Sequence, residues 1–275
     1  MRQSSWIFAC TLLIVAIGVT TAGAAEPATQ PSHESIPGTL VTFDMVKVPG
    51  GKVTVKTGDG ATEVDVKPFW IGKTEVTWDE YDIFCFQLDL TDAEKAAGTE
   101  AKSRPSKPYG APDFGFGHRG LPAMCVTYHA AEQYCVWLSK KMGKTYRLAT
   151  EAEWLLAARG GAEGEDSPTD ANELGKLAWS YDNADGKVHP VAKKEPNLLG
   201  LYDMAGNVRE WVKGIDDKPV ARGGSYDDDP ENVGYHVRQL QTKDWNSTDP
   251  QNPKSKWWLS DGPMVGFRIA RDAEE

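Results

Sequence analysis

The second half of the chain is long, weakly periodic and rich in tryptophan, and this combination restricts the folds open to it. After Gly161, residues such as Gly, Pro, Asn and Asp interrupt each stretch before a long helix or strand could form. Long segments without regular structure are uncommon in compact domains and are usually functional or disordered. Large aromatic side chains favour burial, so we expect packed loops around Trp179, Trp211, Trp245, Trp257 and Trp258. The 27 Gly and 17 Pro of the 275 residues fit such a loop-rich domain.

The first 40 residues are expected to lie outside the folded domain. Arg2 precedes an apolar run from Ile7 to Val19, and small residues follow at 22–25, a pattern that predicts a cleaved secretory signal peptide at residues 1–25. The run is shorter than the roughly 20 residues of a spanning helix, so we expect no membrane span after cleavage. Residues 26–40 are rich in Pro, Ser, Thr and Gly and predict a flexible linker. The protein is therefore expected to be exported, either periplasmic or secreted.

Charge and cysteine content exclude several classes of function. The formal net charge is −10 and no Lys- or Arg-rich cluster occurs, so neither nucleic acid nor an anionic membrane surface is an expected partner. Beyond the predicted signal peptide the cysteines are Cys85, Cys125 and Cys135. An odd number leaves at least one thiol unpaired, and no Cys-x-x-Cys spacing indicates a structural metal. Apolar neighbours flank all three, which favours buried cysteines that pack as small hydrophobic residues.

Helices are expected in the first part of the domain, which should begin near Leu40. Thr77 and Thr150 each stand three residues before a Glu, which is the spacing of a capping box. A helix should therefore follow each threonine. Another helix is expected from about residue 129 to residue 142, with Gly143 as its left-handed stop.

Short strands are expected before and after these helices. Apolar residues alternate from Val41 until the phase slips by one residue between Met45 and Val46, which predicts a bulge or a break. A hairpin is expected within residues 53–66, followed by a strand at residues 69–75. Further short strands are predicted at residues 187–192, 219–223 and 265–270.

Five short phrases occur in an order that resembles the sulfatase-modifying-factor family, whose founding members are formylglycine-generating enzymes. They are FWIGKTEVT at residues 69–77, YRLATEAEW at 146–154, NLLGLYDMAGNVREW at 197–211, RGGS at 222–225 and GFR at 266–268. One such phrase would be weak, whereas five in order over residues 41–271 are specific. The resemblance implies a domain at residues 41–271 with an α+β, irregular C-type-lectin-like fold: few short strands and helices, and many loops.

The resemblance also concerns two positions shortly after the Gly-Gly-Ser turn. Formylglycine-generating oxidases hold copper there with two cysteines, and Asp228 and Val233 occupy these positions here. Cu(I) prefers soft thiolate ligands, which a carboxylate cannot replace, and valine cannot bind a metal. Copper is therefore not expected, and this chain is expected to be a branch that lacks the copper-binding pair. Ser225, which matches an active-site serine of the family, remains as a residual catalytic position.

A structural calcium ion is implied at Asp203, Gly206, Val208 and Glu210, which match calcium-binding positions of the family. Calcium takes about six to eight oxygen ligands, often carboxylates and backbone carbonyls on a tight turn. Asp203 and Glu210 would offer side-chain oxygens, and Gly206 and Val208 would offer carbonyls. The ion would brace loops and perform no chemistry. In the alternative, Glu210 pairs with a nearby Arg and Asp203 caps a turn.

A ligand-binding surface is predicted beside the Gly-Gly-Ser turn. The segment from Arg104 to Leu121 is rich in proline and aromatic residues, which predicts either a binding rim or packing for the neighbouring surface. The family resemblance places Ser225 in a groove that receives an extended peptide. We therefore expect Ser225, Tyr226 and Arg119 to contact a ligand.

Two functional hypotheses follow. The first is an exported, non-oxidase binding or accessory module whose partner is an exported protein such as a sulfatase, or a glycan. The alternative is a formylglycine-generating-type oxidoreductase, or another metal-dependent enzyme, that acts on sulfatase cysteines or another exported substrate. Asp228 and Val233 favour the first hypothesis. The retained Ser225 and its groove keep the second one open, with a different thiol as the reactive group.

Overall fold

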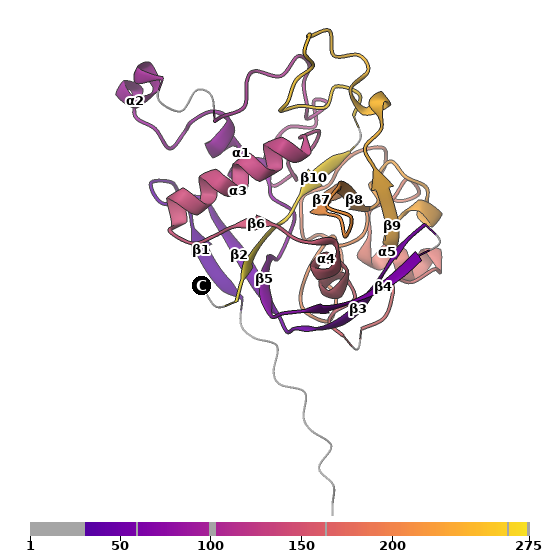
Figure 1. Cartoon of the computed structure of the whole chain (residues 1–275). Coiled ribbons are helices and arrows are strands. Elements are labelled where there is room, and N and C mark those ends of the chain that lie inside the picture. Colours follow the sequence, from indigo (N-terminus) through magenta and orange to yellow (C-terminus); the bar gives the residue numbers. More distant parts are fainter. Residues whose placement is uncertain (1–30, 59, 99–102, 163, 263, 274–275) are drawn as a thin grey trace, which may run out of the picture.

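The computed structural model describes residues 31–58, 60–98, 103–162, 164–262 and 264–273. The predicted signal peptide at residues 1–25 lies outside the described residues. Short strands, a few helices and long loops make up the described domain (Figure 1). The helices are α1 (Trp78–Cys85), α2 (Asp92–Ala97), α3 (Tyr128–Met142), α4 (Glu151–Ala158) and α5 (Ala171–Leu177), with short 3-10 turns at Pro230–Asn232 and Lys243–Asn246.

The strands form three sheets. A five-stranded sheet has the order β1-β2-β5-β11-β6, a four-stranded sheet has the order β10-β7-β8-β9, and β3 and β4 form a separate hairpin. The strands are β1 (Ser32–Ser35), β2 (Thr42–Val48), β3 (Gly51–Thr57), β4 (Gly60–Val66), β5 (Phe69–Gly72), β6 (Arg147–Leu148), β7 (Arg209–Lys213), β8 (Pro219–Gly223), β9 (Gly234–Leu240), β10 (Val265–Phe267) and β11 (Ile269–Asp272). This mixed architecture, with little regular structure, agrees with the predicted fold.

Local capping signals place the helices where the sequence predicts them. The Thr77 hydroxyl accepts the N–H of Glu80, and the Glu80 carboxylate accepts the N–H of Thr77, which completes the capping box of α1. The same reciprocal pair begins α4 at Thr150. Helix α3 ends at Gly143, whose φ of 66° is left-handed. The three predicted helices are thus confirmed, while α2 and α5 were not predicted.

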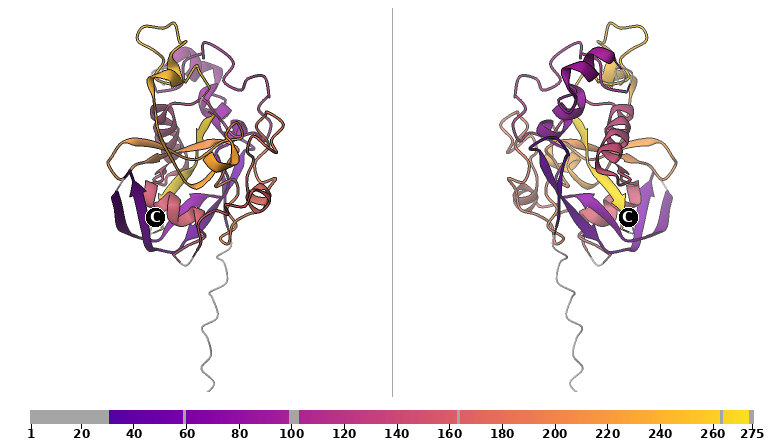
Figure 2. Two further views of the ribbon diagram at one scale, coloured as in Figure 1. Left: turned by 90° about the vertical axis from the view of Figure 1, so that its right-hand side faces the viewer. Right: turned by 90° about the vertical axis from the view of Figure 1, so that its left-hand side faces the viewer.

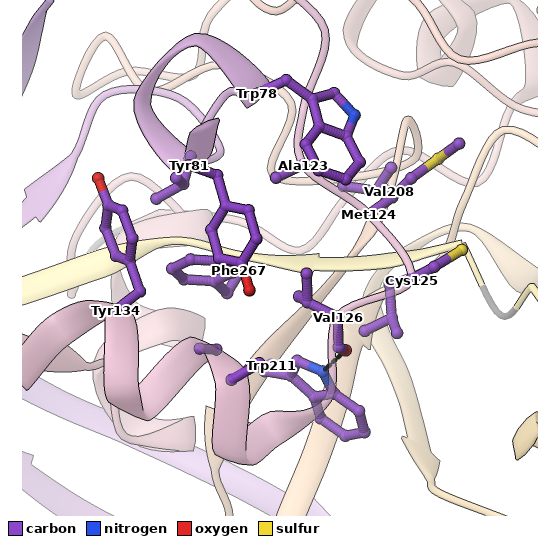
Figure 3. Close-up of a cluster of buried hydrophobic side chains, with 14 of the residues drawn as sticks. Trp78, Tyr81, Ala123, Met124, Cys125, Val126, Tyr134, Val208, Trp211 and Phe267 are labelled. Carbon is purple, nitrogen blue, oxygen red and sulfur yellow. Dashed lines mark hydrogen bonds between the residues drawn. The ribbon is translucent and has the colours of Figure 1, made fainter. Parts of the chain in front are cut away.

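The two main sheets lie between two hydrophobic cores. Neighbouring residues of β2 point into different cores, with Met45 in the core beneath α1 and α3 and Val46 in the core beneath α4. The predicted bulge at these residues is therefore wrong, since β2 is continuous and the phase change reflects burial of both faces. Figure 3 shows the aromatic part of the first core, where Tyr81 and Tyr134 pack against Phe267 of β10 at ring distances of 6.0 and 5.3 Å.

Two other local predictions differ from the structure. The expected flexible linker at residues 26–40 contains β1, whose Glu34 accepts two hydrogen bonds from Lys144 at 2.7 and 2.8 Å. Ion pairing at a sheet edge holds this strand, and composition gives no sign of it. Residues 187–192 form a loop and not the predicted strand. Val188 is buried there by packing, and the segment pairs with none of the described strands. Among the described residues, none of the helices is both long and apolar enough to cross a membrane.

The three described cysteines are buried, as predicted, and all three are free, which the sequence left open for two of them. Burial raises the pKa of the Cys85 and Cys125 thiols to about 12, and it raises the pKa of the Cys135 thiol further still. Such thiols stay protonated and pack as apolar groups. None of them is an activated nucleophile in this arrangement.

The capping carboxylate of α1 gives a testable pH dependence of stability. Burial raises the pKa of Glu80 from 4.5 to about 7, against the lowering effect of its bonds to Thr77. The folded state therefore binds this proton more tightly than the unfolded state. Protonation of Glu80 stabilises the folded state fully below about pH 4.5, and this stabilisation is lost as the pH rises to about 7. Glu80→Gln keeps the cap without the charge. We expect its free energy of unfolding, relative to the native chain, to rise by on the order of 1–3 kcal/mol across this range.

Urea unfolding at a series of pH values measures this difference. Glu94→Gln is the matched control, because Glu94 forms the equivalent capping box on the solvent-exposed helix α2. A Glu80→Gln profile parallel to that of the native chain would refute the predicted titration.

Candidate functional site at the Gly-Gly-Ser turn

The turn after β8 is held by Asp228, one of the two predicted copper positions. The backbone N–H and the hydroxyl of Ser225 both donate to Asp228 Oδ2 at 2.8 Å. The other carboxylate oxygen pairs with the guanidinium of Arg209, at the start of β7. Gly224 allows the close return of the chain, because a Cβ there would lie 2.5 Å from the carbonyl oxygen of Asn232. An internal Ser-Asp-Arg network therefore occupies this position.

Val233, the second copper position, is a core residue. Its side chain is 1% exposed and belongs to the core beneath α4. It carries no metal-binding atom, and the Asp228 carboxylate is hard and already bonded. The residues present therefore do not fit a copper ion.

Ser225 and Tyr226 do not form the exposed ligand surface that the sequence predicts. Both are buried, at 0% and 3% exposure, because the turn folds back against the core. The Tyr226 hydroxyl donates to Met264 Sδ at 3.2 Å, and its ring packs edge-on against Phe116 at 6.1 Å. Arg119, the third predicted contact residue, is exposed. Tyr226 therefore joins the Pro-aromatic segment to the core instead of facing a ligand.

The segment of residues 103–121, here called the Pro-aromatic loop, is fastened to the α1 region at both ends. At one end, buried Arg104 donates to Asp89 at 3.1 Å just beyond α1. At the other end, His118 Nδ1 lies 2.7 Å from Asp82 Oδ2 on α1, and the imidazole stacks on Trp78. The middle of the loop is thus held outward, and it exposes large aromatic side chains: Tyr109, Phe114 and Phe116.

A cavity of about 180 Å³ lies between the Pro-aromatic loop and residues 246–260. The two segments run side by side at the end of the molecule opposite the β3–β4 hairpin (Figures 1 and 2). The cavity is lined by Pro108, Tyr109, Gly110, Ala111, Pro112, Phe114, Cys125, Asn246, Thr248, Asp249, Ser255, Trp258, Leu259 and Ser260. It is therefore mainly apolar, with a few polar groups on one wall.

Glu210 of the predicted calcium site is paired with a buried arginine. Both of its carboxylate oxygens accept hydrogen bonds from Arg268, at 3.0 Å from Nε and 2.8 Å from Nη2. One of them also accepts the indole N–H of Trp154 at 2.9 Å. This arrangement is the alternative that the sequence left open for Glu210.

Asp203 provides the only free oxygen of the predicted side-chain ligands. Its Oδ2 accepts the N–H of Ala192 at 2.7 Å, whereas its Oδ1 is buried without a hydrogen-bond partner. Burial raises the pKa of Asp203 to about 6, and burial also raises the pKa of Glu75 well above its usual value. Glu75, Asp203 and Glu210 thus form a crowded acidic cluster around Arg268.

The fit to calcium is therefore partial. Asp203 offers an oxygen, but both Glu210 oxygens are bonded, and the described part of the chain contains no group of three or more His, Cys, Asp or Glu that could hold a metal. Calcium at Asp203, Gly206, Val208 and Glu210 stays a prediction. A bound ion would supply positive charge that the acidic cluster lacks.

Comparison with known proteins places the chain in a family. Residues 33–273 match the family described as sulfatase-modifying factor enzyme 1-like domain. The protein belongs to this family. The match covers nearly all of the described domain, so the Gly-Gly-Ser turn and the acidic cluster both lie within the matched region.

Relatives within and around the family carry different names. The chain is 29% identical to inactive C-alpha-formylglycine-generating enzyme 2 of Bos taurus, over 84% of this chain and 89% of that protein. It is 27% identical to the chaperone protein LppX of Paenibacillus barcinonensis, over 63% and 72%. It is 30% identical to serine/threonine-protein kinase Pkn1 of Chlamydia trachomatis over 66% of this chain, but it spans only 29% of the kinase.

Solved structures agree on the fold. PvdO from Pseudomonas aeruginosa superposes with a TM-score of 0.61 at 27% identity, over 90% of this chain and all of that one. Treponema denticola variable protein 1 gives a TM-score of 0.65 at 23% identity, over 88% and 99%. The predicted formylglycine-generating enzyme-type, C-type-lectin-like fold is thereby confirmed.

Arg209 is the functional-site residue that sequence reasoning missed. It lies within the same phrase as the predicted calcium ligands, but its partner Asp228 is 19 positions away. The sequence shows an arginine followed later by three consecutive aspartates, but it does not show which of them pair. The antiparallel pairing of β7 and β8 brings Arg209 close to Asp228.

We predict that the Arg209–Asp228 pair stabilises the turn in this family member. Arg209→Met should leave the partly buried Asp228 carboxylate without its counter-ion and lower the free energy of unfolding by about 1–3 kcal/mol. Asp228→Asn alone should also destabilise, since it weakens the bonds to Ser225. In a double-mutant cycle the combined variant should lose less than the sum of the single variants. Additive losses in urea unfolding would show that the two side chains do not interact.

The calcium prediction is tested by chelation. If the ion binds the native state only, excess chelator should lower the melting temperature of protein that is first shown to contain calcium. Asp203→Asn, which removes charge at the free oxygen, should reduce that dependence. A melting curve that does not respond to chelator would reject calcium binding. Asp228→Asn serves as a control outside the acidic cluster.

Proposed function

We propose that this chain is a non-oxidase binding module of the sulfatase-modifying-factor family that acts as an accessory to an exported protein. The observation that supports it most directly is the filling of the copper position. Asp228 there accepts from Ser225 and pairs with Arg209, while Val233 lies in the core. Ligands of these types do not provide the soft donor pair that Cu(I) requires.

The alternative of an oxidase that uses another thiol has little physical support. Cys125 lines the cavity beside the Pro-aromatic loop, but it is 1% exposed and its pKa is raised to about 12 by burial. In Figure 3 its side chain lies at the edge of the aromatic cluster, apart from Tyr81 and Phe267. A single protonated thiol neither binds copper as a pair nor acts as a ready nucleophile.

The names of two relatives agree with this proposal, whereas two others are named formylglycine-generating enzyme. One relative is described as an inactive formylglycine-generating enzyme and another as a chaperone. Export rests on residues 1–25 and is part of the proposal, as is the choice of a protein partner such as a sulfatase over a glycan. The exposed aromatic side chains of the anchored Pro-aromatic loop provide a surface of the kind that carries binding energy at protein interfaces.

We predict that the purified chain does not convert cysteine to formylglycine in a sulfatase-motif peptide, even with copper supplied. The physical reason is the lack of two thiolates at Asp228 and Val233. Mass spectrometry of the peptide measures the conversion, with a formylglycine-generating enzyme as the positive control. Conversion that disappears in Cys125→Ser would overturn the proposal and identify the reactive thiol.

A further inference from the structure

The cavity beside the Pro-aromatic loop combines aromatic walls with a single ionised side chain. Tyr109 and Phe114 stand at its mouth, with 68% and 47% of their surfaces exposed. Trp258 lies in its wall and is fixed by donation of its indole N–H to the Ser106 carbonyl at 2.7 Å. Of the lining residues, Asp249 alone carries a formal charge at neutral pH.

Asp249 is held as a buried carboxylate. It is 5% exposed, and its two oxygens accept the N–H groups of Gln251 at 2.9 Å and Ser255 at 2.6 Å. Burial acts to raise its pKa, but these hydrogen bonds and the charge of Lys254 lower it below the usual value. The Lys254 ammonium itself donates to the Ser247 carbonyl at 2.8 Å. Asp249 therefore presents negative charge to the cavity.

The aromatic rings are positioned by the backbone around them. Gly262 has a φ of +59°, and a Cβ there would lie 2.5 Å from the Phe114 ring, so the glycine makes room for this side chain. Phe114 also lies 6.5 Å from Phe116, which packs on Tyr226. The cavity wall is thus continuous with the core.

We propose that this cavity binds an alkylammonium group, supplied by a lysine side chain of the protein partner. A cation is attracted by the faces of aromatic rings, and a nearby carboxylate adds to that attraction. A water-sized group needs roughly 10–15 Å³ of such space, so about 180 Å³ holds an ammonium group with its adjacent methylene groups. The net charge of −10 favours the approach of a cation from a distance.

This inference rests on the proposed function and names the chemistry that the partner presents. An anionic group is disfavoured by Asp249, and a purely apolar group would give that carboxylate no polar partner within the cavity. A cationic side chain can contact both the aromatic rings and the Asp249 carboxylate. The exposed mouth at Tyr109 lets a side chain enter from solvent.

The test is a titration of the mature protein with three small probes, followed by tryptophan fluorescence and calorimetry. The probes are N-acetyl-lysine amide, choline, and 3,3-dimethylbutan-1-ol, which is the neutral isostere of choline. We expect saturable binding of both cations, with affinity for the isostere about tenfold lower than for choline. Asp249→Asn and Phe114→Leu should each weaken cation binding by a similar factor. Tyr181→Ala, which alters an exposed aromatic residue outside the cavity, should leave it unchanged.

The outcomes separate this inference from the proposed function. Equal affinity for choline and its isostere, or no saturable binding of either cation, would overturn cation recognition. Binding of choline without binding of the lysine derivative would overturn the assignment to a protein side chain. Melting temperatures show which variants remain folded, and Phe114→Leu provides the test if Asp249→Asn does not fold. Formylglycine formation would overturn the proposed function and leave cation binding to be judged on these titrations alone.

Discussion

The buried contact between Arg268 and Glu210 is the interaction on which the rest of the fold depends. Arg268 stands between β10 and β11, where the chain passes from the four-stranded sheet to the five-stranded sheet. Its guanidinium binds Glu210 on β7 and also donates to the carbonyl oxygens of Gly72 and Tyr202 at 2.8 and 2.7 Å. One side chain therefore joins both sheets and a long loop. Removing either partner of such a buried pair lowers the free energy of unfolding by about 3–5 kcal/mol, because the remaining charge is buried with neither a counter-ion nor water around it.

A second set of polar contacts fastens the two ends of the Pro-aromatic loop. Arg104 and His118 fasten its two ends through Asp89 and Asp82, so the loop between them has little freedom to lose when a partner binds. Binding surfaces that are already ordered lose less conformational entropy on association. Arg104 and His118 thus position the loop through their contacts with acidic side chains.

The parts of the structure that could be predicted are those set by neighbours in sequence. The capping threonines Thr77 and Thr150 and the stop at Gly143 depend on a few adjacent residues, so their helices were found. The family phrases predicted the fold, which the solved structures confirm. Distant contacts were not visible: nothing near Asp228 indicates that Arg209 pairs with it, and nothing near Tyr226 indicates that its ring is buried against Phe116.

The three buried cysteines bear on the chemical reactivity of the domain. Burial raises the pKa of these thiols far above neutral pH, so little thiolate forms, and thiolate is the form that exchanges and oxidises. Burial in the fold thus lowers the reactivity of Cys85, Cys125 and Cys135. The described domain therefore holds its fold with three free thiols and without a disulfide among them.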